Sequence, residues 1–355
     1  MKSKVYFVPV GPSDTVESIN EKISRLLAVS NVLGCASKGD KVALKVHFGE
    51  EGNTGFIRPP HLRPVCEALT ARGAIAILAD ANTLYRGRRL NAKDHRALAL
   101  EHGFTKEITG GDVFIPDDNN QADVLDIPIN QKYIKIAKVA RFFIDADALV
   151  AVTHFKGHIL TGFGGAIKNI GMGCATRQGK LAQHNDVAPV VHIENCTGCG
   201  ACLAICPAGA ISIENKKSKV ASDKCIGCAS CLAVCPTMAM FVDFAAGDKV
   251  QDKMAEYTLA VLESKKQKAG FLNFAVRINK ECDCWGQENP RIAPDVGILA
   301  SLDPVSIDKA SLDLVNKACG KDIFKSVHPD QDGIKQLKYA QAIGLGNLEY
   351  ELIEL

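Results

Sequence analysis

Eight cysteines in the middle of the chain are the residues whose type and spacing most directly indicate chemistry. They form two copies of the pattern Cys-x2-Cys-x2-Cys-x3-Cys-Pro, and one constant offset maps the first copy onto the second. The eight are Cys196, Cys199, Cys202, Cys206, Cys225, Cys228, Cys231 and Cys235. This spacing is typical of proteins that bind two iron–sulfur clusters.

The pattern predicts two [4Fe–4S] clusters in a module of the bacterial two-cluster ferredoxin type. Three closely spaced thiolates curl round one cluster, and the fourth cysteine of each copy reaches the other cluster. The predicted sets are Cys196, Cys199, Cys202 and Cys235 for one cluster, and Cys206, Cys225, Cys228 and Cys231 for the other. Zinc sites usually use two well-separated pairs of cysteines rather than four cysteines in one short segment. Disulfides would need an oxidising compartment. Both alternatives are therefore less suited to this stretch.

Composition places the chain among ordinary globular proteins. Its 355 residues are 47% hydrophobic and 23% charged, with a net charge of +2. That charge does not predict nucleic-acid binding, and we find no apolar run near the ~20 residues that span a bilayer. The first residues predict a strand rather than a signal peptide. Fourteen cysteines without such a signal predict a reducing, cytoplasmic setting.

Strands and helices are predicted on both sides of the cysteine-rich segment. Apolar runs predict strands at 4–10, 41–47, 74–80, 148–153, 271–278, 296–301 and 349–353, and an antiparallel pair at 124–129 and 133–139. Helical spacing predicts helices from 14, with Asp14 as a cap, and at 58–72, 91–102, 248–268, 304–318 and 332–343. Phe271–Ile278 is expected to alternate between buried and exposed positions. Alternating strands and helices predict an α/β fold with a mostly parallel sheet and flanking helices.

This organisation implies a module inserted into a larger domain. We expect an α/β domain whose first part is 1–188 and whose second part is 243–355. The inserted α+β ferredoxin-like module with two [4Fe–4S] clusters occupies 189–242. Surface loops tolerate such insertions because the ends of a domain commonly lie close together.

The segment 153–184 follows a predicted buried strand and is rich in glycine, histidine and basic residues. Ligands bind beyond the carboxyl ends of strands in α/β sheets, so we expect a site here. The candidate catalytic residues are His154, His158, Lys168 and His184, with the histidines handling protons and Lys168 facing an anion. The candidate ligand-binding residues are Gly162, Gly164, Gly165, Lys168 and Asn169, whose backbone suits an anion nest.

Plainer interpretations of these residues remain open. The segment lacks both the Walker and the Gly-x-Gly-x-x-Gly pattern, because Ile167 replaces the required glycine. His154 and His158 could pair on a helix as metal ligands, but Gly157 between them favours a loop. Lys168 could be a solvated lysine, and Cys174 a buried thiol. We expect Cys35, Cys66 and Cys319 to be inert.

A second short motif, Cys282-Asp-Cys284-Trp285, follows another predicted strand and carries the single tryptophan. Two cysteines one residue apart form at best a strained disulfide. Half of a metal site, a reducible thiol pair and a structural pair all remain open, with a role in lining the site weakly favoured.

Several stretches resemble a widespread prokaryotic family of iron–sulfur proteins with a domain of unknown function. They are HFKGH with TGFGGAIKNIGMGC, the CDCW motif, and PDVGILASLDPVSIDKASLDLV. The segment from His158 to Lys168 is also remotely similar to the α/β domain of lactate racemases. That similarity implies a lysine that anchors a nickel-pincer nucleotide, on Lys168, and a proton-transfer histidine, on His158. Ala166-Ile167 and the inserted module depart from the racemase pattern.

The sequence therefore predicts an iron–sulfur redox protein. Electrons from a ferredoxin or reductase would pass through two [4Fe–4S] clusters to a small ligand, substrate or further cofactor of unknown identity held by 153–184. A ferredoxin-linked oxidoreductase is one class of enzyme that fits. The alternatives are a pure electron carrier with a docking domain, a non-redox isomerase of racemase type, and a redox sensor with structural clusters.

Overall fold

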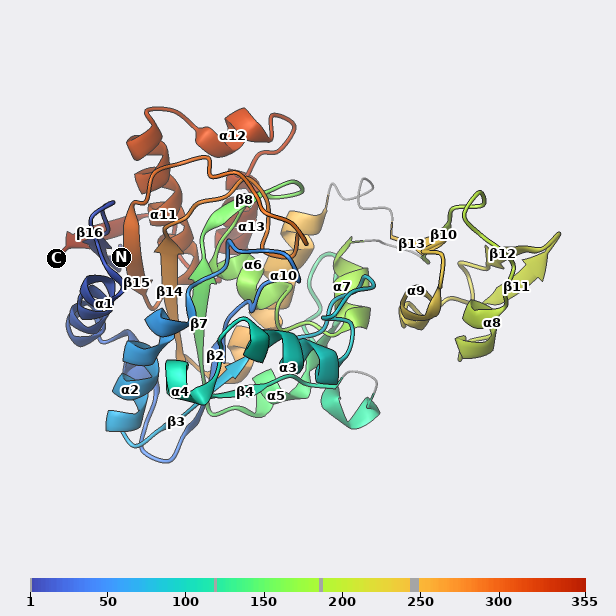
Figure 1. Cartoon of the computed structure of the whole chain (residues 1–355), viewed down its shortest axis with the longest axis horizontal. Helices are drawn as coiled ribbons and strands as arrows, with labels where there is room; N and C mark the ends of the chain where they lie inside the picture. Colours follow the sequence, from blue (N-terminus) through green and yellow to red (C-terminus); the bar gives the residue numbers. More distant parts are fainter. Residues whose placement is uncertain (1, 118–119, 185–187, 243–248) are drawn as a thin grey trace.

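A mixed eight-stranded sheet forms the centre of the protein (Figure 1). The structure is a computed structural model that describes residues 2–117, 120–184, 188–242 and 249–355. The strand order is β16-β1-β15-β14-β7-β2-β3-β4. The bounds are β1 (Ser3–Pro9), β2 (Lys41–Lys45), β3 (Ile75–Ala79), β4 (Asp112–Phe114), β7 (Ala148–His154), β14 (Ala269–Ala275), β15 (Gly297–Ser301) and β16 (Tyr350–Glu354). Only β15 runs antiparallel to its neighbours, which confirms the predicted α/β class with a mostly parallel sheet.

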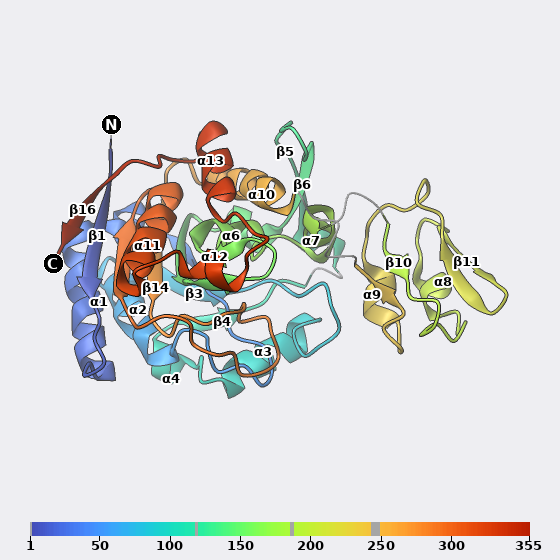
Figure 2. The same cartoon turned by 90° about the horizontal axis from the view of Figure 1, so that it is seen from above.

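Helices cover both faces of the sheet (Figure 2). One face carries α1 (Val16–Ser30) and α2 (Arg63–Ala71); the other carries α6 (Ala166–Gly171), α10 (Val250–Lys265), α11 (Pro304–Cys319) and α13 (Ile334–Ala342). Successive strand residues point to opposite faces, so Leu149 and Ala151 join one core and Val150 and Val152 the other. Shorter helices are η1 (Val32–Cys35), η2 (Pro59–Leu62), α3 (Ala92–Glu101), α4 (Lys106–Thr109), η3 (Gln121–Asp123), α5 (Arg141–Asp145), α7 (Arg177–His184) and α12 (Ile323–Val327).

Burial on both faces explains the character of the central strands. Every residue of β7 is buried, as its continuous apolar run predicts. Every residue of β14 is buried as well, so the expected alternation along 271–278 is wrong. A strand between two helical layers has no solvent face and needs no polar positions.

The structure decides three further local details that the sequence analysis considered. The cap of α1 is Thr15, whose hydroxyl accepts from Ser18 N, while Asp14 accepts from Gly11 N. The expected helix 58–72 is divided into η2 and α2. His154 and His158 lie in β7 and in β8 (Lys156–His158), so they share no helix face.

Two small hairpins flank the sheet. β5 (Val124–Pro128) pairs antiparallel with β6 (Ile136–Ala140), which confirms the predicted pair. β8 pairs with β9 (Gly162–Gly164) directly after β7. The expected helix 248–268 is α10, and its predicted first residue lies outside the described part of the chain.

The eight cysteines lie in a smaller unit on the side of the molecule away from the two termini (Figure 1). It contains β10 (Val190–Val191), α8 (Ala201–Ile205), β11 (Ile211–Glu214), β12 (Lys217–Val220), α9 (Ser230–Val234) and β13 (Met240–Phe241). Antiparallel pairing of β10 with β13 brings its two ends together. We call residues 190–241 the eight-cysteine unit; its ferredoxin-like character and the proposed domain limits stay predictions. Within the described ranges, no helix is long and apolar enough to cross a membrane.

Candidate functional site

Loops from four neighbouring parallel strands meet at the carboxyl edge of the sheet. The loop after β2 reaches the loop after β14, because Glu50 N donates to Asp283 O at 3.0 Å. The loop after β3 contacts the same segment, where Tyr85 donates its hydroxyl to Cys284 O at 3.0 Å. Gly157 N, after β7, donates to Asn279 O at 2.8 Å. This is the edge at which α/β sheets bind ligands.

Asp283 is the anchor of these loops. Its carboxylate binds His154 Nδ1 at 2.9 Å and Lys156 Nζ at 3.0 Å, and all three side chains are buried. Burial opposes the charge, yet His154 and Lys156 hold the pKa of Asp283 well below its usual range. The other ring nitrogen of His154 faces Val276 O at 3.1 Å. His154 is therefore engaged on both sides and positions Asp283.

Cys282 and Cys284 flank that anchor in a tight turn. Trp285 N donates to Cys282 O at 3.0 Å, which closes the turn. Lys168 Nζ donates to Cys282 Sγ at 3.2 Å. The hydrogen bond from Cys284, partly opposed by burial and assisted by Lys168, holds the pKa of Cys282 well below its ordinary value. The same interaction, together with burial, raises the pKa of Cys284.

A second buried network braces the loops after β2 and β3. Asp80 Oδ1 binds Lys45 Nζ at 2.9 Å, and its Oδ2 accepts from Arg89 Nη2 at 3.1 Å. Burial opposes the charge on Asp80, but Lys45 and Arg89 keep its pKa well below normal. The Tyr85 hydroxyl oxygen also lies 3.0 Å from Glu50 Oε2. These groups satisfy one another and hold the edge rigid.

The two remaining candidate histidines, His158 and His184, lie close enough to Lys168 to be affected by its charge. Leu160 N donates to His158 Nδ1 at 3.2 Å. Burial and then Lys168 and His184 hold the pKa of His158 well below normal, and burial with Lys168 lowers that of His184 to about 3. Both rings are therefore neutral near pH 7 and suited to hydrogen bonding rather than to accepting protons.

The side chain of Asn169 forms hydrogen bonds to the sheet. Its Nδ2 donates to Thr153 Oγ1 at 2.9 Å and to Lys45 O at 3.1 Å, and its Oδ1 accepts from Lys45 Nζ at 2.9 Å. These contacts tie α6 to β2 and β7. The expected ligand-binding role of Asn169 stays a prediction.

The glycines of the expected anion nest pack against protein groups. A Cβ at Gly165 would lie 2.3 Å from Asp308 Oδ1, because that carboxylate accepts from Ala166 N and Ile167 N. A Cβ at Gly164 would lie 2.9 Å from Lys168 Cδ. Gly162 has φ +73, and a Cβ added there would lie 3.1 Å from Gly333 Cα. The first amides of α6 are thus capped from α11, and Gly164 gives room to the Lys168 side chain.

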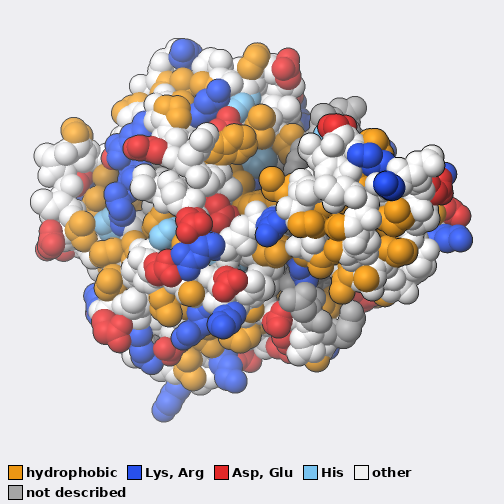
Figure 3. Space-filling model, turned by 45° about the vertical axis from the view of Figure 1, so that its right-hand side comes forward, with side chains coloured by type: hydrophobic (Ala, Val, Ile, Leu, Met, Phe, Trp, Pro, Cys, Tyr) orange, Lys and Arg blue, Asp and Glu red, His pale blue; other side chains and the backbone are white. Residues whose placement is uncertain are grey.

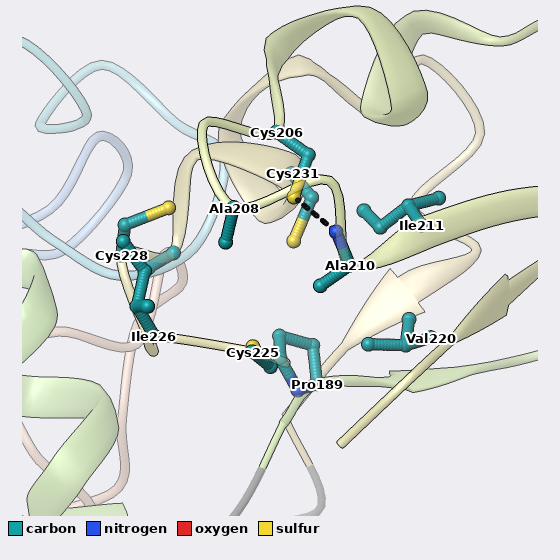
Figure 4. Close-up of a pocket in the computed structure, with 11 residues that line it drawn as sticks. Pro189, Cys206, Ala208, Ala210, Ile211, Val220, Cys225, Ile226, Cys228 and Cys231 are labelled. Carbon is teal, nitrogen blue, oxygen red and sulfur yellow. Dashed lines mark hydrogen bonds between the residues drawn. The ribbon is translucent and has the colours of Figure 1, made fainter. Parts of the chain in front are cut away.

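The eight cysteines surround two cavities in the described structure. Figure 4 shows the first, of about 340 Å³ including space open to solvent. The first cavity is lined by Cys206, Cys225, Cys228 and Cys231, and the second by Cys196, Cys199, Cys202 and Cys235. Each set combines three cysteines of one copy with the last cysteine of the other. This is the grouping that the sequence predicts for two clusters.

The donor set suits two [4Fe–4S] clusters. Four thiols stand around each cavity, and amides point at sulfurs: Ala210 N to Cys206 Sγ at 3.3 Å, and Ser218 N to Cys196 Sγ at 3.3 Å. Amide donors of this kind stabilise charged cluster sulfur. Among the described residues, no three His, Cys, Asp or Glu side chains converge on one point as a single metal ion requires. Ligation itself stays a prediction.

The loop after β3 touches both the site and the eight-cysteine unit. Arg86 Nη1 donates to Pro236 O at 3.0 Å, directly after Cys235. Leu84 packs in one apolar cluster with Leu181 and the unit's buried cysteines. Tyr85, between Leu84 and Arg86, contacts Cys284 O. One short segment therefore connects the two cysteine-bearing regions.

Sequence reasoning missed the anchoring role of Asp283, Lys156 and Tyr85. The CDCW motif was the available signal, since Asp283 stands between its two cysteines. The partners come from other strands, so no local spacing relates them.

The fold defines an α/β protein with a mostly parallel sheet and an attached eight-cysteine unit. The chain belongs to the family described as a domain of unknown function, DUF362, whose profile matches residues 42–313. A comparison with curated proteins finds no match.

Two solved structures are remotely similar. The lactate racemase apoprotein from Thermoanaerobacterium thermosaccharolyticum is 14% identical with a TM-score of 0.38, over 78% of this chain and 51% of that one. A protein from Thermotoga maritima is 11% identical with a TM-score of 0.43, over 90% of this chain and 60% of that one. This chain thus spans between half and two thirds of each. At these scores neither likeness supports a statement about activity.

Proposed function

We propose that the protein is an iron–sulfur redox protein that links two [4Fe–4S] clusters to a ligand site at the carboxyl edge of its sheet. The observation that carries the proposal is the pair of cavities, each ringed by three cysteines of one copy and one of the other. The clusters would supply one-electron transfer. The protein's own groups surround them with thiols and amide donors.

The α/β domain contributes a polar site for an anionic or carbonyl-bearing ligand. Lys168 is partly exposed and keeps its charge: burial opposes it, but Cys282 and Cys284 raise its pKa. With Nδ1 accepting from Leu160 N, neutral His158 carries its proton on Nε2 and can donate there. The Lys168 ammonium and the His158 Nε2 donor together favour binding of a negatively charged oxygen. We therefore propose a binding role for His158, while the proton-transfer role expected for the histidines stays a prediction.

The electron partner is an external protein, a ferredoxin or a reductase, in a reducing cytoplasm. The eight-cysteine unit exposes apolar side chains, which Figure 3 shows on the right-hand part of the molecule. They include Ile193, Leu203, Ile205, Ile226 and Met238. Apolar surface of this kind is typical of sites that bind another protein.

Anaerobic purification with iron and sulfide analysis tests the proposal. We expect about eight irons per chain, reversible bleaching on reduction, and electron paramagnetic resonance signals of reduced [4Fe–4S] clusters. A folded protein that binds zinc in place of iron would contradict the proposal. Clusters that bind but cannot be reduced by any donor would favour a structural role and leave the isomerase and sensor alternatives.

A further inference from the structure

Cys282 and Cys284 form a thiol pair that neither the clusters nor the sheet accounts for. They occupy the first and third positions of the turn closed by Trp285 N and Cys282 O. Residues two apart across such a turn have Cα atoms within the roughly 4.4–6.8 Å that a disulfide spans. The pair carries no disulfide in this structure.

The surroundings of the pair distinguish its two thiols. Cys282 is buried and receives the Lys168 ammonium at 3.2 Å, whereas Cys284 is partly exposed. Asp283 between them is fixed by His154 and Lys156, so the turn is held rigidly. The accessible Cys284 thiol is suited to attack a substrate, and the buried Cys282 thiol beside Lys168 is suited to the second exchange step.

The pair also adjoins the route to the eight-cysteine unit. Tyr85 contacts Cys284 O, and the neighbouring residue Arg86 contacts Pro236 O beside Cys235. Two clusters that each carry one electron would together supply the two electrons that reduce one disulfide.

We propose that Cys282 and Cys284 are a catalytic dithiol that reduces a disulfide substrate, R–S–S–R, and is itself returned to the thiol form by two electrons from the proposed clusters. This inference rests on the proposed function for its electron supply. Cys284 and Cys282 are the catalytic residues, and Lys168 is a positioning residue.

The chemistry balances in two exchange steps. Cys284 gives its proton to the Cys282 thiolate and attacks one substrate sulfur. The substrate S–S bond breaks, one RS⁻ leaves, and a Cys284–S–S–R bond forms. Cys282, which loses its proton to the leaving RS⁻, then attacks Cys284 Sγ and releases the second RS⁻. Two electrons and one proton would convert the Cys282–Cys284 disulfide back to one thiol and one thiolate, and the proposed clusters would supply the two electrons.

A single tryptic peptide isolates the pair for the test. Cleavage after Lys280 and after Arg291 gives residues 281–291, which contain no other cysteine. Cluster-loaded protein is treated anaerobically with oxidised glutathione, alkylated and digested. In the wild type we expect an unalkylated peptide two hydrogens lighter. In Cys282→Ser we expect glutathione on Cys284, and in Cys284→Ser at least tenfold less adduct on Cys282.

Controls separate this inference from the proposed function. Cys319→Ser, a partly exposed thiol elsewhere, should behave as wild type. Loaded, redox-active clusters with no disulfide in 281–291, or equal adducts in both serine variants, would overturn the dithiol and leave the relay. A disulfide that forms but recovers equally fast with and without clusters under dithionite would overturn the electron supply and leave the dithiol.

Discussion

At the residue scale, the chemistry concentrates on contacts between side chains that are distant in sequence. Lys168 touches Cys282, and Asp283 holds both His154 and Lys156. Charges buried together interact far more strongly than at the surface. Lys168 therefore helps to lower the pKa of Cys282, and His154 and Lys156 lower the pKa of Asp283.

Removing the ammonium beside Cys282 tests this coupling. Because Lys168 helps lower the pKa of Cys282, we expect Lys168→Ala to raise that pKa and to slow alkylation of the 281–291 peptide roughly tenfold at neutral pH. The pH dependence of iodoacetamide labelling measures it. Lys41→Ala, an exposed lysine at the start of β2, should change nothing. An unchanged profile in Lys168→Ala would remove the lysine from the thiol chemistry.

At the element scale, two close approaches keep the loops in place. Asp308 on α11 caps α6, and Gly157 allows β8 to lie against the backbone at Lys280. Both contacts join elements that are not neighbours in sequence. The site is thus held by packing between layers.

Asp308 should make stability depend on pH. Burial raises its pKa to about 6, above the usual value of 3.8. The folded state therefore binds the proton more tightly, so the contribution of Asp308 to stability is largest below about pH 4 and falls as pH rises to about 6. In Asp308→Asn this dependence should disappear, with a loss of about 1–3 kcal/mol from imperfect capping. Urea unfolding at several pH values measures both, with Asp112→Asn as the exposed control.

Gly157 should tolerate no side chain. A Cβ there would lie 2.1 Å from Lys280 O, which forces β8 away from the 276–291 loop. We expect Gly157→Ala to lower the free energy of unfolding by about 1–3 kcal/mol and to weaken the Lys168–Cys282 contact. Gly11→Ala, whose Cβ meets nothing closer than 3.9 Å, is the matched control. Equal stabilities would show that the loop yields without cost.

At the scale of the whole molecule, the internal repeat makes the two cavities interdependent. Each last cysteine crosses to the cavity of the other copy. The loop after β3 then joins this unit to the sheet through Leu84, Tyr85 and Arg86. The arrangement places the unit beside the site.

The crossed grouping predicts the result of single substitutions. Cys206→Ser should disturb the cluster of Cys225, Cys228 and Cys231, and Cys235→Ser that of Cys196, Cys199 and Cys202. Each variant should fall from about eight to about four irons. Mössbauer or resonance spectra of the remaining cluster would identify which is lost. If both variants lose the same cluster, the grouping is wrong.

The contact of Arg86 with Pro236 predicts a kinetic effect. Arg86 is exposed, so Arg86→Ala should change stability by less than about 0.5 kcal/mol. Loss of the contact between Arg86 and Pro236 should nevertheless slow recovery of the Cys282 and Cys284 thiols after reduction of the clusters. Stopped-flow quenching and alkylation measure the rate of this recovery. Arg25→Ala, exposed on α1, serves as the control. Equal recovery rates would place the electron route elsewhere.

The sequence by itself determined the class of the fold, the positions of the main strands and helices, and the cysteine repeat. These depend on hydrophobic periodicity and on ligand spacing within one short segment, which are local properties. The loop 153–184 and the CDCW motif could also be identified as candidates, because both follow strands.

Only the tertiary structure decided which of those candidates act together. It showed that Asn169 bonds to the sheet and that Gly165 lies against Asp308, brought Lys168 to Cys282, and placed Asp283 as the anchor of His154 and Lys156. The physical reason is that parallel strands bring their carboxyl ends to one edge, so residues more than a hundred positions apart become neighbours. Burial and neighbouring charges at this edge then shift the pKa values of side chains such as Asp283. The spacing of residues in the sequence does not encode these surroundings.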